Sequence, residues 1–109
     1  MSDPNLIPGN RSVTVGANES ITIGGGRAES VGKGAVTTVG EAMRVSVGKQ
    51  LEFVAGDEIV LRVGAASLTM RKDGTIILKG GSITIDGTGT VNVKSSRDIV
   101  LKGSKVLQN

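Results

Sequence analysis

The sequence predicts an all-β repeat protein whose core is shared between several chains. Glycine recurs at a strict interval of eight residues, at Gly16, Gly24, Gly32, Gly40, Gly48, Gly56 and Gly64. Most of these glycines follow an apolar–spacer–apolar triplet and precede mostly polar residues. The chain has one Phe, no Trp and no Tyr, so the large side chains that usually fill a core are almost missing. A strict period without a conventional core favours a filament over a globule.

Each octad is interpreted as one short strand followed by one corner. Residues two positions apart point to the same side of a strand, so the paired apolar residues of each octad share a face. We expect the seven glycines to be structural corners in φ > 0 conformations, which glycine enters without steric cost. The predicted core positions are Val13, Val15, Ile21, Ile23, Val45, Val47, Phe53, Leu61, Val63, Ile83, Ile85, Val91, Val93, Ile99 and Leu101. Phe53 is followed on the same side by Ala55, which favours an exchange of volume between adjacent layers.

A single chain of this composition has few ways to become stable alone. Its 17 glycines lose much backbone entropy on folding, and its apolar side chains are small. No Cys or His is present, which excludes disulfides and a zinc site as cross-links. Oligomerisation is therefore expected to be obligatory.

The chain divides into three segments by pattern. Residues 1–11 hold both prolines and no repeat, which predicts a lead-in or a linker remnant. Residues 12–66 are the glycine-cornered octads. Residues 67–109 keep short apolar strands, with a turn expected at Asp73-Gly74, but lose the regular glycines. No stretch shows helical apolar spacing, a signal peptide or a membrane span.

The residues that carry chemistry elsewhere are interpreted here as structural. Gly24-Gly25-Gly26 lacks the Lys and the following helix of a phosphate-binding loop. Asp57 and Glu58 are adjacent on a strand and are expected to face opposite ways, as part of a solvated face. Ser95-Ser96 has no histidine to act as its base. We therefore expect no catalytic, cofactor-binding or metal residues.

Positive charge gathers in the distal segment. Residues 67–109 carry seven Lys or Arg against three Asp, whereas residues 1–66 carry six against seven acidic residues. The excess fits a solubilising surface, or attraction to anionic lipid or lipopolysaccharide. Nucleic acid is not expected as a partner, because no aromatic stacking platform is available.

Three features together resemble a known family. They are the Val-x-Val-Gly octad, the stretch SLTMRKDGTI at residues 67–76, and VLKGSKV at residues 100–106. In combination they resemble the C-terminal spike of VgrG, the valine–glycine repeat protein at the tip of type VI secretion systems. That spike is similar to the central spike of contractile phage tails. The resemblance covers residues 12–109.

The resemblance implies a homotrimer of parallel chains wound into a triangular β-prism, an intertwined triple-stranded parallel β-helix. Each octad would supply one face, hydrogen-bonded to neighbouring chains, and residues 67–109 would form the distal β-helix and its tip. The implied function is a rigid, non-enzymatic spike that punctures a target cell envelope. It would be assembled in the bacterial cytoplasm and then secreted into the medium or the target cell.

Four kinds of partner follow from the same resemblance. They are the two other copies of the chain, the N-terminal hub of a full-length protein, the target membrane in transient contact, and a PAAR-repeat tip protein or effector. The expected tip-docking residues are Ser104, Lys105, Val106, Leu107, Gln108 and Asn109. No His-x-His motif is present that would hold a metal at the apex.

One alternative stays open from the sequence, a parallel β-helix domain that binds or degrades carbohydrate. Such solenoids have longer coils and line a groove with aromatic, Arg and carboxylate residues. An eight-residue coil cannot close around a core of its own, which favours the spike.

Overall fold

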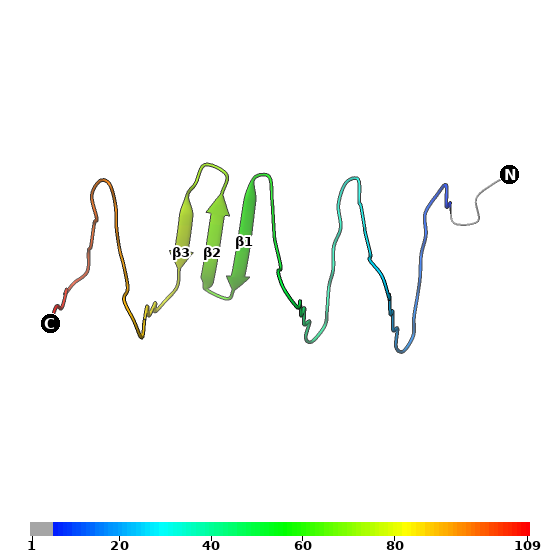
Figure 1. The fold of residues 1–109 in the computed structure, drawn as a ribbon, viewed down its shortest axis with the longest axis horizontal. Coiled ribbons are helices and arrows are strands. Elements are labelled where there is room, and N and C mark those ends of the chain that lie inside the picture. Colours follow the sequence, from blue (N-terminus) through cyan, green and yellow to red (C-terminus); the bar gives the residue numbers. More distant parts are fainter. Residues whose placement is uncertain (1–5) are drawn as a thin grey trace. The chain divides into compact units, whose positions relative to one another are not determined.

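The computed structural model describes residues 6–109, in two units that meet between Val45 and Ser46. All the regular secondary structure in these residues lies in the second unit, and it consists of three β-strands (Figure 1). The all-β part of the predicted fold class is confirmed. No helix long and apolar enough to cross a membrane occurs among residues 6–109.

The first unit consists of extended segments separated by bends. The chain bends at Gly16, Gly24, Gly32 and Gly40, with straight octad segments between them. No strand pairing occurs among the described residues up to Val45, so the backbone of these segments has no ladder partner within the chain. Backbone groups without partners are costly unless water or another chain satisfies them. These octads therefore lack internal support.

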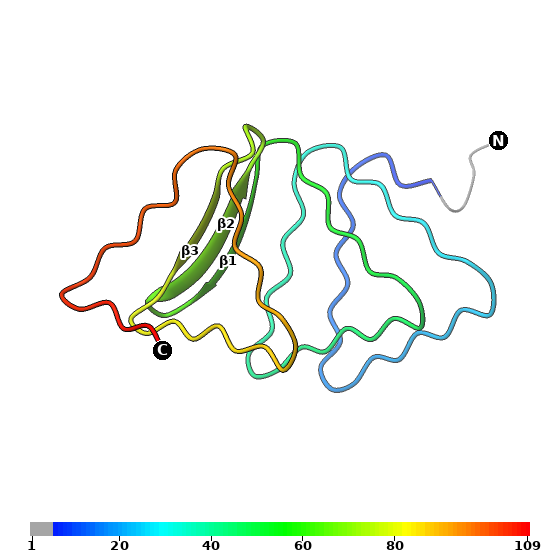
Figure 2. The ribbon, with the colours of Figure 1, turned by 60° about the vertical axis from the view of Figure 1, so that its left-hand side comes forward.

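The second unit begins in the same way and then forms a sheet. After bends at Gly48 and Gly56, strand β1 runs over Glu58–Val63, β2 over Ala66–Arg71 and β3 over Ile76–Lys79. The three strands form an antiparallel meander in the order β1-β2-β3. Figure 2 shows them lying side by side with a common twist.

Two turns with left-handed glycines close the meander. Gly64 has a φ of 51° and Ala65 has no positive φ, which is the φ pattern of a two-residue type II′ hairpin turn. In the second turn, the Gly74 N–H donates to the Arg71 carbonyl at 3.0 Å, and Gly74 has a φ of 91°. The turn expected at Asp73-Gly74 is present.

The positive φ expected at every octad glycine is wrong for six of the seven. Among the seven predicted corners, Gly64 alone adopts a positive φ; the six earlier ones bend the chain without one. A Cβ atom added at any of these six would meet nothing within 4 Å in the single chain. In an octad the change of direction is therefore made without a left-handed residue. The hairpin at Gly64 reverses the chain within two residues and requires that conformation.

The expected pairing also differs at the last octad. The resemblance implied that every octad pairs with parallel strands of other chains, but β1 pairs with β2 of its own chain, and antiparallel. The reason is the short turn at Gly64, since antiparallel strands can be joined by a two-residue loop. The segment boundary expected between residues 66 and 67 falls inside β2.

No side chain in residues 6–109 is buried within the single chain. Every predicted core position is exposed, from 46% for Val15 to 81% for Val63. Phe53, the largest of them, is 73% exposed. The shared core thus stays a prediction about an assembly of several chains.

Candidate functional site: an apolar sheet face

The register of the meander sorts its side chains onto two different faces. Directly opposed residues in an antiparallel pair lie on the same face. One cross-strand row is Ile59–Met70–Ile76, and the next row on that face is Leu61–Leu68–Leu78. The pair Val63–Ala66 ends this face beside the first turn. The eight residues Ile59, Leu61, Val63, Ala66, Leu68, Met70, Ile76 and Leu78 are called the apolar face below.

The opposite face carries all the charges of the three strands. Its rows are Glu58–Arg71, Val60–Thr69–Ile77 and Arg62–Ser67–Lys79. This face can be solvated as it stands. The apolar face, in contrast, exposes uncharged apolar side chains to water: Val63 and Ile76 at its margins are 81% and 69% exposed. A contiguous apolar surface of this kind marks an interaction site.

Two open hollows adjoin the apolar face. One is lined by four charged residues and by Phe53, Ala55, Ile59 and Met70, which brings the end of the preceding octad beside the sheet. The other is lined mostly by apolar-face residues, from Leu61 to Leu78. The same-side placement of Phe53 and Ala55 stays a prediction.

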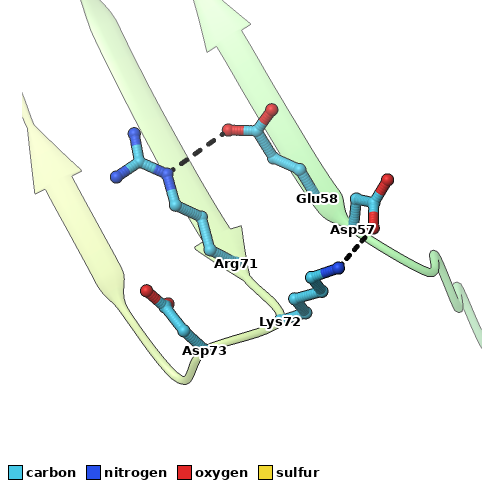
Figure 3. A pocket seen from close by; sticks show the side chains of 5 residues that line it. All are labelled: Asp57, Glu58, Arg71, Lys72 and Asp73. Atoms are coloured by element: carbon cyan, nitrogen blue, oxygen red, sulfur yellow. Dashed lines mark ion pairs between the residues drawn. The ribbon is translucent and has the colours of Figure 1, made fainter.

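Charged residues gather where β1 begins and β2 ends, around a third open hollow (Figure 3). Arg71 Nε lies 3.6 Å from Glu58 Oε1, and Lys72 Nζ lies 3.2 Å from Asp57 Oδ1. The Lys72 N–H also donates to the Asp57 carbonyl at 3.0 Å, extending the ladder beyond the strands. These contacts hold β1 and β2 together at the end opposite the Gly64 turn. All four side chains remain substantially exposed, so each ion pair contributes little.

Asp73 supports the second turn through its side chain. The Thr75 N–H donates to Asp73 Oδ1 at 3.0 Å. This hydrogen bond to the backbone N–H of Thr75 lowers the pKa of Asp73 below its ordinary value of 3.8. The ionised carboxylate thus favours the turn.

The acidic residues of this end do not form a catalytic or metal-binding arrangement. Asp57 is paired with Lys72 and Glu58 with Arg71. Within residues 6–109, no group of three or more His, Cys, Asp or Glu is placed to hold a metal ion.

The expected tip residues lie outside the sheet. The chain bends at Ser104 and has no regular secondary structure from Lys105 to Asn109. Val106 and Leu107 are both exposed. Nothing in the single chain covers them.

The predicted core omitted the five residues of the apolar face that lie on β2 and β3, although the sequence holds a signal for those on β2. In the octads beginning at Gly48 and Gly56, apolar residues follow the glycine at odd offsets of three, five and seven. After Gly64 they fall at even offsets, on Ala66, Leu68 and Met70. A two-residue hairpin turn needs this one-residue change, because it alone returns the apolar side chains of β2 to the face of β1.

Comparisons with known proteins agree with the repeat pattern. Residues 9–32 match the family described as Gp5 C-terminal repeat (3 copies). Over 55 residues, 50% of this chain, the sequence is 48% identical to the type VI secretion system spike protein VgrG1b of Pseudomonas aeruginosa. The matched stretch spans 7% of the length of that relative. The predicted resemblance to a C-terminal segment of a VgrG spike is confirmed.

Proposed function

We propose that this chain forms a rigid trimeric spike of a type VI secretion system, which punctures the target cell envelope. The observation that carries the proposal is the 48% identity to a protein named as such a spike. The exposed repeats support it, because octads with unpaired backbone and apolar side chains need identical strands beside them. Three intertwined copies supply such strands and remove lateral sheet edges.

Stiffness is what the proposed architecture contributes to puncturing. In a prism of three wound chains, bending must stretch the ladder hydrogen bonds of one side along the whole length. The proposed role requires neither a nucleophile nor a metal ion. It requires that the chains stay together under load.

The oligomeric state tests this proposal first. Sedimentation equilibrium of the full chain at micromolar concentration should give three times the chain mass, without dissociation on dilution. A folded monomer would contradict the trimeric spike. It would favour the alternative of a carbohydrate-binding or carbohydrate-degrading β-helix, which no observation in residues 6–109 supports.

Secretion tests the cellular part of the proposal. We propose that the spike is assembled in the cytoplasm and released by sheath contraction. Its presence in the culture medium should then depend on a working type VI sheath. Equal release from a sheath-deficient strain would contradict this role.

We further propose that Ser104–Asn109 form the docking face for a PAAR-repeat tip protein or effector. The exposed side chains of Val106 and Leu107, on a backbone without strand partners in the chain, support strand pairing and apolar contact with a partner. Deletion of residues 105–109 should abolish capture of the cognate PAAR-repeat protein by a trimer that remains folded. Replacing Gln50, an octad residue outside this segment, by Ala is the control and should leave capture unchanged. Undiminished capture after the deletion would place docking elsewhere.

A further inference from the structure

The octad repeat does not by itself fix how neighbouring chains are aligned, whereas the meander has no such repeat. Because the glycines repeat every eight residues from Gly16 to Gly64, a chain displaced by one octad still sets glycine against glycine. Five of the seven octads carry the apolar triplet at the same interval, and Glu29 and Thr37 interrupt it in the other two, so a displaced assembly still keeps much of its packing. Strand register is weakly specified when the pattern that should fix it is repeated.

The meander is the part of the second unit that breaks this degeneracy. Its strands are joined by two different turns, and the phase of its apolar residues changes at Gly64. No other segment of residues 6–109 has strand pairing within the chain. Its pairs are local, joining residues at most 13 apart, as in Glu58–Arg71. Local pairing forms early, because little loop entropy is lost in closing it.

The surface of the meander indicates what covers its apolar side. The apolar face carries no charged side chain, while the opposite face carries all four charged residues of the strands. Along residues 57–79 the cations number four and the carboxylates three, so copies of this segment repel one another little. Phe53 and Ala55 of the preceding octad line one hollow with Ile59 and Met70 of this face, beside the ion pairs Asp57–Lys72 and Glu58–Arg71. That octad itself lacks any strand partner in the chain. The face and the octad are therefore expected to share one kind of occupant.

We infer that the apolar face binds the same face of two further copies of this chain, and that the meander thereby sets the register of the whole assembly. The inference rests on the proposed trimer and specifies which segment aligns it. In this arrangement a chain displaced by one octad cannot place its apolar face against the other two. The repeats supply length, and the non-repeating meander supplies alignment.

Spin-label distances test the register directly. The chain has no cysteine, so Ser46→Cys gives a single labelling site in the exposed spacer of an octad. An aligned trimer places three labels in one layer and gives a single narrow distance distribution. Displacement by one octad adds a longer distance.

Three substitutions in the Ser46→Cys background test whether the meander sets the register. Leu68→Gln alters the centre of the apolar face, Thr69→Gln alters its half-buried neighbour on the opposite face, and Ile23→Gln alters one octad. We expect Leu68→Gln to broaden the distribution or to lower the trimer fraction severalfold, while the other two keep one narrow distance. Leu68→Ala provides a milder version in case Leu68→Gln prevents assembly.

The outcomes separate this inference from the proposed function. Equal behaviour of the Leu68 and Ile23 variants, whether both stay aligned or both fail to assemble, would overturn the register role while the trimer stands. A parent protein that is monomeric in the same measurement would instead overturn the trimer itself.

Discussion

The octads of residues 12–56 and the meander of residues 58–79 use the same alternation of apolar residues with opposite results. In the octads the chain bends at glycine without a positive φ and finds no partner strand of its own. In the meander, Gly64 adopts a φ of 51° and the next strand folds back onto the last octad. The connection therefore decides whether an alternating strand pairs within its own chain.

The two regions also differ in what they leave for other chains to supply. An octad needs both backbone partners and a cover for its apolar side chains. The meander has satisfied most of the backbone groups of β2 and needs cover for one face alone.

The largest effect is expected from removing Phe53, the bulkiest octad side chain. If three copies share a core, Phe53→Ala should lower the free energy of unfolding by about 3–5 kcal/mol per site, because it opens a cavity. The melting temperature at fixed protein concentration measures this loss. Val54→Ala, at the adjacent spacer position, is the control and should change little. Nearly equal melting of Phe53→Ala and the parent would place Phe53 at the surface of the assembly.

A smaller effect distinguishes the two kinds of glycine. Gly64→Val should destabilise by about 1–3 kcal/mol, since a β-branched residue resists a positive φ and the hairpin depends on it. Gly40→Val should cost less, because Gly40 has no positive φ and open space beside it in the single chain. Thermal melting compares the two variants. The reverse order would show that neighbouring chains crowd the octad glycines more than the hairpin strains its own.

The charged end of the meander should contribute still less. Arg71→Gln removes the partner of Glu58, and we expect a loss of less than about 1 kcal/mol, because both side chains are roughly half exposed. The difference from the parent should shrink further in 1 M salt, where exposed charges are screened. A loss that salt leaves unchanged would show that this ion pair becomes buried on assembly.

The smallest effect concerns acid and the second turn. The pKa of Asp73 is lowered in the folded chain, so its contribution is fully present above the unfolded value of 3.8 and disappears as the pH falls through the lower folded value. Between pH 5 and pH 3 the melting temperature of the parent should therefore fall slightly more than that of Asp73→Asn. Identical acid profiles would mean that the Thr75 N–H does not favour the ionised carboxylate.

Much of this protein can be predicted from the sequence because its information is periodic. The spacing of the glycines and of residues such as Val13 and Val15 requires neither a partner nor a fold to be recognised. Strand alternation is a property of the backbone, so the all-β class and the placement of Ile59, Leu61 and Val63 on one face follow from it. The lack of large core residues indicated equally early that one chain cannot bury a core.

The pairing of the strands could not be predicted from the sequence, because it depends on the backbone conformation of the connections. Gly40 and Gly64 occupy equivalent places in the repeat, yet one bends the chain and the other reverses it. The two-residue reversal at Gly64 aligns Leu61 with Leu68, and the second turn aligns Leu68 with Leu78. A repeat specifies which side chains share a face, whereas the φ angle at a single glycine determines which strand lies beside them.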